Sequence, residues 1–252
     1  MVRIAPSIVS APLANLEEIV RILEAAGADM LHFDLEDGSF VPLMSMGTRI
    51  IQELRPLTRL PFDVHLMMVN PEWIIPELAR YGANRVSVHY EACPYPRRTL
   101  GLIAQHGMQA GLAFNPKTIL PPLLHCRPFL SFMVILTTEP EAGACSYLPI
   151  VLDKVKEGKS QAGLEGVEWV VDGGITAENA QDVARAGADV LVSGRGIFEG
   201  GTVVENIRRI RSAANAANAL NAANALNAAN ALNAANVPNA SNDLHENERS
   251  ST

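Results

Sequence analysis

The chain has 252 residues, 48% of them hydrophobic, which is enough for one domain the size of an α/β barrel or for two small domains. It carries 20 Lys and Arg residues against 27 Asp and Glu residues, and the formal charge of −7 argues against nucleic acid or an anionic membrane as the main partner. Three cysteines are too few for a disulfide framework, and no apolar run approaches the length of a membrane span. We therefore expect a cytoplasmic protein without a signal peptide.

Short β-rich runs alternate with helical segments through the first part of the chain. The first helical segment, residues 15–28, is amphipathic and ends near Gly27, and a later one, residues 176–188, begins at Thr176 and ends at Gly187. Eight strands are expected, at residues 4–9, 30–35, 62–67, 85–90, 109–114, 129–136, 167–172 and 189–194. Eight such units predict a parallel (β/α)8 TIM barrel, because an open doubly wound sheet usually has fewer strands and a nucleotide fingerprint.

The composition changes near residue 212, where a six-residue repeat of Asn, Ala and Leu begins and leads into a polar segment. Leu220, Leu226 and Leu232 lie six positions apart, about 240° around a helix, so they form no apolar stripe. We expect residues 1–211 to form the barrel domain and residues 212–252 to extend its last helix or to be disordered. A helix that binds a partner protein is the alternative.

Polar side chains gather where the expected strands end, which is where TIM barrels place their active sites. Strand alternation puts His32 and Asp34 on the face opposite the apolar residues that must contact the helices. His65 lies near the end of the third strand, and Asp172 ends the seventh. Two imidazoles and two carboxylates suit Zn²⁺ or a similar transition ion, although each residue alone could be structural. His89, near the end of the fourth strand, is either a support for this site or a packed histidine.

Glycine-rich turns follow the expected seventh and eighth strands. Gly173 and Gly174 precede one helical segment, and Gly194, Arg195 and Gly196 precede another. Backbone amides at helix starts in this part of a barrel commonly bind phosphate, so these residues are candidate substrate contacts. Each cluster is equally compatible with a tight turn of no further function. Arg195 either adds a bidentate contact to the phosphate or lies on the surface.

Several segments together resemble the ribulose-phosphate 3-epimerase family. They extend from about Ile4 to Ile210 and read IAPSIVSA, AAGADMLHFDLEDGSFVP, LPFDVHLM, VHYEACPYPRRTL, AGLAFNP, VDGGIT and AGADVLVSGRGIF. The resemblance implies a metal-dependent isomerase of the pentose phosphate pathway that interconverts D-ribulose 5-phosphate and D-xylulose 5-phosphate. The implied cofactor is one divalent ion, Zn²⁺ or alternatively Fe²⁺, Mn²⁺ or Co²⁺. The implied partner is a small ketose phosphate, and we expect a homo-oligomer.

The resemblance also assigns roles to individual residues. The positions that match His32, Asp34, His65 and Asp172 bind the metal. Asp34 is implied as the proton acceptor and Asp172 as the proton donor, on opposite faces of the sugar. Ser7 and His65 match positions that touch the substrate, and Gly143 matches the family's closing loop. This chemistry is physically coherent, because inverting a carbon next to a ketone requires proton removal on one face and proton return on the other.

The sequence departs from the family pattern at two places. Glu36 stands where the family generally has methionine, with a milder change at Leu136, and strand alternation directs the Glu36 carboxylate toward the site. The loop at residues 139–145 has fewer glycines and two added carboxylates, which would repel phosphate. We hypothesise that Glu36 alters substrate choice.

Three other functions therefore remain open. They are an epimerase of another ketose phosphate such as a hexulose 6-phosphate, a barrel decarboxylase, and a non-catalytic sugar-phosphate-binding barrel. A decarboxylase usually needs a lysine near the strand ends, and the expected strand ends have none.

Overall fold

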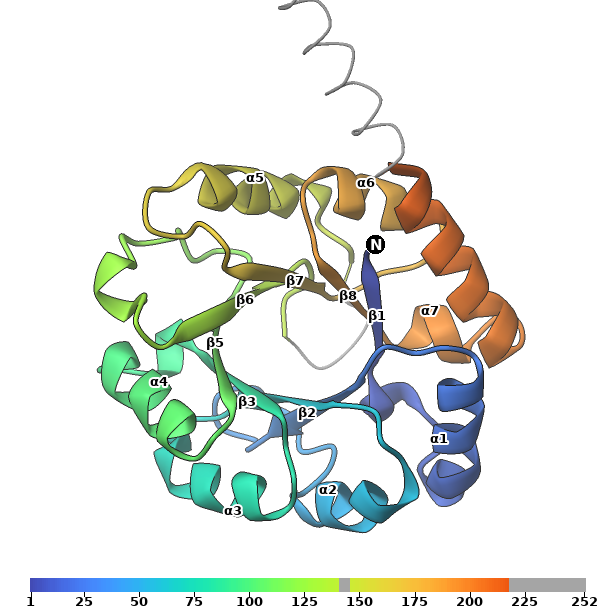
Figure 1. Ribbon diagram of the computed structural model, residues 1–252. Coiled ribbons are helices and arrows are strands. Elements are labelled where there is room, and N and C mark those ends of the chain that lie inside the picture. The colour runs from blue at the N-terminus through green and yellow to red at the C-terminus, as the bar shows by residue number, and fades with distance from the viewer. Residues whose placement is uncertain (141–145, 218–252) are drawn as a thin grey trace, which may run out of the picture.

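The computed structural model describes residues 1–140 and 146–217, and within them eight parallel strands form a barrel with helices around it (Figure 1). The strands are β1 (Arg3–Pro6), β2 (Leu31–Glu36), β3 (Phe62–Met67), β4 (Arg85–His89), β5 (Gln109–Phe114), β6 (Leu130–Leu136), β7 (Glu168–Asp172) and β8 (Val190–Ser193). Strands β2 to β8 pair in chain order, β8 pairs with β1, and a parallel bridge between Ser7 and His32 joins β1 to β2. The predicted TIM barrel is confirmed.

The helices lie outside the strands in a ring. They are α1 (Leu16–Ala25), α2 (Arg49–Leu54), α3 (Ile75–Arg80), α4 (Pro96–Gln105), α5 (Leu152–Ser160), α6 (Ala180–Arg185) and α7 (Arg195–Phe198), followed by a helix over residues 203–217. Helix α1 ends before Gly27, whose φ of 81° suits glycine. Helix α6 begins later than predicted, because a turn precedes it in which the Thr176 hydroxyl accepts the backbone N–H of Glu178.

Strand alternation distributes the side chains as the sequence predicted. Leu31, Phe33 and Leu35 of β2 belong to the apolar layer between the strands and the helices. His32 and Asp34 face the barrel interior, where they are 0% and 5% exposed. A second, smaller apolar cluster fills the interior and includes Ala5, Met30, Ala113, Phe132, Val134, Leu136, Val170, Val190 and Val192. The alternation therefore directs the apolar side chains of β2 toward the helices and its polar side chains toward the barrel interior.

A charged network lies in the barrel at the starts of the strands. The Arg85 guanidinium donates to Asp63 Oδ1 at 2.9 Å and to Glu168 Oε1 at 2.5 Å. It also lies over the Phe132 ring, 3.7 Å from the centroid. Arg85 and Asp63 are 3% and 0% exposed, so each charge depends on its partner for solvation. The network also reaches one of the predicted metal ligands, because the Asp63 carboxylate contacts His32.

The helix over residues 203–217 continues past the expected domain boundary at residue 211, and its Ala214 is part of the core. Residues 218–252 lie outside the described residues, so the expectations for the repeat segment remain predictions. Among the helices of the described chain, none combines the length and the apolar character that crossing a membrane requires.

Candidate active site

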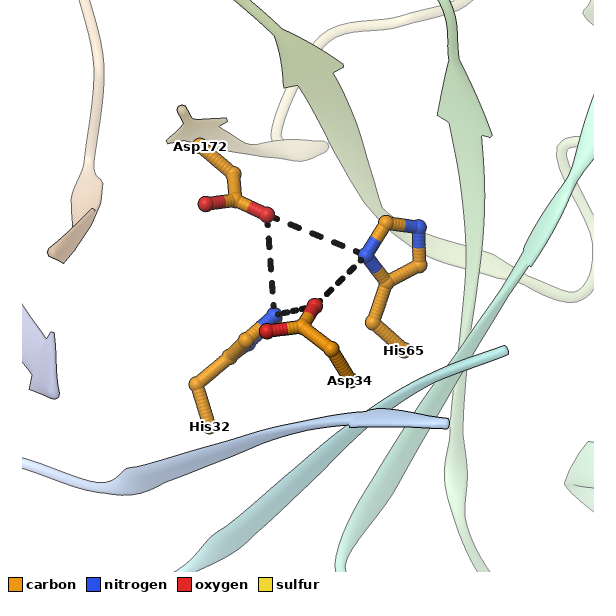
Figure 2. Close-up of side chains that lie close together, drawn as sticks. All are labelled: His32, Asp34, His65 and Asp172. Carbon is orange, nitrogen blue, oxygen red and sulfur yellow. Dashed lines mark hydrogen bonds and ion pairs between the residues drawn. The ribbon is translucent and has the colours of Figure 1, made fainter. Parts of the chain in front are cut away.

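The four residues predicted to bind a metal converge at the carboxyl-terminal part of the barrel (Figure 2). Each offers one ligand atom, and the four atoms all lie within 4.8 Å of one another. Asp34 Oδ1 is 3.1 Å from His32 Nε2 and 3.3 Å from His65 Nδ1. Asp172 Oδ2 is farther from the same nitrogens, at 3.7 and 3.8 Å. Strands β2, β3 and β7 thus bring together side chains that are up to 140 positions apart in the sequence.

The cluster could hold a divalent transition ion. Two imidazole nitrogens and two carboxylate oxygens form a donor set that such ions accept. His65 Nδ1 is buried and has no hydrogen-bond partner among the described residues, although an unsatisfied buried polar atom costs about 1–3 kcal/mol. A cation between the four ligand atoms would satisfy this nitrogen and would compensate the two carboxylates.

The two aspartates differ electrostatically. Burial raises the pKa of Asp34, but the adjacent His32 and His65 outweigh it and hold the pKa well below its usual range. Burial and the charge of Asp34 raise the pKa of Asp172 to about 6. Burial lowers the pKa of His32, yet Asp34 and Asp63 raise it well above its usual value. One carboxylate is therefore held ionised while the other can carry a proton near neutral pH, a difference typical of acid/base pairs.

A cavity of about 1020 Å³ opens above the cluster, and Asp34 and Asp172 contribute to its wall. The cavity is also lined by five of the predicted substrate contacts, Ser7, Gly173, Gly174, Gly194 and Arg195. His65 is fully buried, and Gly143 lies outside the described residues. The Ser7 hydroxyl donates to Asp34 Oδ2 at 2.7 Å, so it positions this carboxylate from the cavity side.

The glycines after β7 and β8 are required by the local geometry. Gly173 has a φ of 110°, and a Cβ there would lie 2.5 Å from the Thr138 hydroxyl oxygen. A Cβ at Gly196 would lie 2.3 Å from the carbonyl oxygen of Ile175. Both turns thus pack closely against neighbouring backbone and side chains, which accounts for these glycines without any ligand.

Glu36 lines the same cavity, as strand alternation predicted. Its Oε2 atom is buried without a hydrogen-bond partner among the described residues, and burial raises the pKa of this carboxyl. The hydroxyl of Tyr147, which also lines the cavity, is buried and without a partner as well. Two side chains of the cavity wall therefore carry polar atoms that no described residue satisfies.

Sequence reasoning missed two carboxylates that contact buried histidines, Asp63 at His32 and Glu91 at His89. Asp63 accepts from His32 Nδ1 at 2.8 Å, and Glu91 lies 3.0 Å from His89 Nδ1. Asp63 could have been found, because it shares its strand face with His65. His89 does contact the cluster: its Nε2 lies 3.0 Å from His65 Nε2.

The fold and the site define a TIM-barrel enzyme with a paired-carboxylate centre able to hold a metal. Residues 3–198 match the model of the ribulose-phosphate 3 epimerase family, and the chain belongs to this family. It is an epimerase, within the isomerase class of enzymes, and the resemblance noted in the sequence is confirmed.

Named relatives agree with this family. Ribulose-phosphate 3-epimerase 1 of Cupriavidus necator is 41% identical over 203 residues, which cover 78% of this chain and 84% of the relative. Ribulose-phosphate 3-epimerase of Bacillus subtilis is 40% identical over 201 residues, covering 79% and 93%. The Escherichia coli K12 enzyme of that name is 39% identical over 199 residues, covering 78% and 88%.

Solved structures share the fold at much lower identity. The 3-hexulose-6-phosphate synthase of Salmonella typhimurium superposes with a TM-score of 0.61 at 13% identity, covering 85% of this chain and 99% of the other. The orotidine 5'-phosphate decarboxylase of Pyrococcus horikoshii gives 0.58 at 17% identity, covering 84% and 99%. At such identities the likeness concerns the barrel alone.

Proposed function

We propose that the protein interconverts D-ribulose 5-phosphate and D-xylulose 5-phosphate by moving a proton at C3 of the sugar. The observation that carries the proposal is the pair of inequivalent carboxylates, Asp34 and Asp172, in the wall of one cavity. The names of the relatives support the choice of sugar. We also propose that the protein is located in the cytoplasm and forms a homo-oligomer.

The two carboxylates divide the proton transfer between them. Asp34, held ionised by its histidine neighbours, accepts the proton from one face of C3, and the Ser7 hydroxyl keeps the carboxylate oriented. Asp172, whose pKa of about 6 lies near neutral pH, delivers a proton to the other face. In the reverse direction the roles exchange. The strands β2 and β7 present the two side chains from different parts of the barrel wall, as a reaction on two faces requires.

The metal would be held by His32 Nε2, Asp34 Oδ1, His65 Nδ1 and Asp172 Oδ2, with Zn²⁺ as our first choice and Fe²⁺, Mn²⁺ or Co²⁺ as alternatives. When bound, a divalent ion stabilises the negative charge that develops on the sugar oxygens as the C3 proton leaves. We assign the phosphate to the turns after β7 and β8, around Gly173, Gly174, Gly194 and Arg195. These line the cavity in the part of the barrel where phosphates commonly bind.

A second candidate is epimerisation of another ketose phosphate, such as a hexulose 6-phosphate. The observation that favours it is Glu36, a carboxylate side chain in the cavity wall whose Oε2 atom has no hydrogen-bond partner among the described residues. A carboxylate in this position can accept a hydrogen bond from a sugar hydroxyl.

Solvent exchange tests both candidates. The metal-loaded protein is incubated with ribulose 5-phosphate in deuterated water, and NMR follows deuterium at C3 together with the appearance of xylulose 5-phosphate. Exchange with inversion is the expected result. Faster turnover of a hexulose 6-phosphate would favour the second candidate, and binding of every sugar phosphate without exchange would overturn both.

A further inference from the structure

We propose that Glu91, acting through His89, sets the tautomer of His65 so that its Nδ1 lone pair faces the metal cluster. His89 and Glu91 are then positioning residues of the metal centre, since neither contributes an atom to it. The inference rests on the proposed metal site but not on which sugar the enzyme converts.

The side chains of His65, His89 and Glu91 form a hydrogen-bonded chain that leads away from the metal cluster. His65 Nε2 lies 3.0 Å from His89 Nε2, and His89 Nδ1 lies 3.0 Å from Glu91 Oε2. The two imidazoles meet edge to edge, because their nearest nitrogens are much closer than their ring centroids, which are 4.9 Å apart. Both histidine side chains are 0% exposed, and the Glu91 side chain is 19% exposed. The contacts available to the two rings are therefore fixed by the protein.

The Glu91 carboxylate, at the far end of this hydrogen-bonded chain, determines which ring nitrogens of His89 and His65 carry protons. Glu91 is surrounded by donors, because its other oxygen accepts the backbone N–H of Asn115 at 2.9 Å and the hydroxyl of Thr118. An ionised carboxylate only accepts, so the proton of His89 is on Nδ1 and points to Glu91. The Nε2 of a neutral His89 then carries a lone pair and accepts the proton of His65 Nε2.

The consequence reaches the cluster. With its proton on Nε2, a neutral His65 has its lone pair on Nδ1, the nitrogen that lies 3.3 Å from Asp34 Oδ1 and 3.8 Å from Asp172 Oδ2. Metals bind the unprotonated nitrogen of a neutral imidazole, and the hydrogen bond at the other nitrogen decides which one that is. A reversed chain would instead place a proton between His65 and the ion.

His32, the other histidine of the cluster, is also hydrogen-bonded to a carboxylate, but directly and not through a second histidine. His32 donates from Nδ1 directly to Asp63 Oδ2 at 2.8 Å, which leaves Nε2 for the metal. Asp63 is held in turn by Arg85. The two histidines thus face the cluster with different ring nitrogens, and in each case a carboxylate terminates the chain on the far side. His89 extends the link from His65, which has no direct carboxylate partner at Nε2, to Glu91.

NMR of the zinc-loaded, ¹⁵N-histidine-labelled protein tests the proton positions directly. We expect the proton on His65 Nε2 to show a scalar coupling through the hydrogen bond to His89 Nε2, and the second proton of the chain to reside on His89 Nδ1. A proton on His89 Nε2 would overturn the proposal. This measurement needs no variant and no substrate.

The variant Glu91→Gln supplies the second test. The introduced amide keeps an oxygen for Asn115 and Thr118 but turns an N–H₂ group toward His89, which reverses the chain. We expect zinc affinity, measured by competition with a chelator, to fall about 10- to 100-fold, as for other residues that orient metal ligands. The matched control is Glu72→Gln, because Glu72 accepts hydrogen bonds from Arg98 and Thr99 away from the cluster. The zinc affinity of this control variant should equal that of the wild type.

Wild-type zinc affinity in the Glu91→Gln variant would contradict the proposal. If this variant does not fold, the wild-type NMR measurement alone decides. Because neither test uses a sugar, a failure here leaves the proposed epimerase reaction standing, and a failure of the proposed reaction leaves both of these measurements valid.

Discussion

Replacing Asp172 by asparagine should separate proton removal from epimerisation. The amide keeps the shape of the side chain and one oxygen, but it neither gives nor takes the reacting proton. Asp34 retains its hydrogen bond from Ser7 at 2.7 Å and its contacts with the histidines. We therefore expect the variant to exchange the C3 hydrogen of one epimer with solvent while forming the opposite epimer only slowly.

The size of the effect follows from the state of Asp172. Burial and the charge of Asp34 raise the pKa of Asp172 to about 6, close to neutral pH, which suits a group that both gives and takes protons. Acid/base catalysis by one positioned group is worth about 10²- to 10⁴-fold, or about 3–5 kcal/mol. Asp172 would also hold the metal through Oδ2, so metal binding by the variant has to be measured separately from the loss of proton transfer.

The assay measures exchange and inversion together by NMR in deuterated water, starting from each epimer in turn, with divalent metal in excess and its binding confirmed. Glu178→Gln is the matched control, because Glu178 lines the same cavity but pairs with Arg209 at the surface. Its rate should stay within about threefold of wild type. A metal-bound Asp172→Asn variant that inverts C3 within tenfold of the wild-type rate, or that exchanges both epimers equally, would refute the two-carboxylate reasoning.

Three further results are expected. Glu36→Met replaces a carboxylate side chain of the cavity wall by an apolar one, so the ratio of kcat/KM for a hexulose 6-phosphate over ribulose 5-phosphate should change about tenfold or more. An unchanged ratio ends the specificity hypothesis. Arg85→Met leaves Asp63 and Glu168 without their buried partner and should lower the free energy of unfolding, measured in urea, by about 3–5 kcal/mol. The control Arg49→Met removes an exposed ion pair and should lower it by less than about 1 kcal/mol. Equal losses in the two variants would contradict this reasoning. Dialysis against a chelator should abolish epimerisation and a divalent ion should restore it, and full activity of the metal-free protein would exclude the metal's role.

The sequence by itself determined the strands and their inward faces. A strand alternates its side chains with a period of two, so the apolar Leu31, Phe33 and Leu35 were enough to orient His32 and Asp34. This information is local, since it depends on the geometry of one strand and on the need to bury apolar surface. The count of eight strand and helix units then led to the barrel, and the known placement of barrel active sites led to the cluster.

Only the tertiary structure decided what those side chains touch. Arg85 pairs with Glu168, 83 positions away, and His65 meets His89 at one particular pair of nitrogens. Such contacts depend on strand register, on rotamers and on the closure of the barrel, none of which is encoded in the periodicity of a single segment. The raised pKa of Asp172 has the same origin, because it comes from burial and from the charge of Asp34, which folding brings near from another strand.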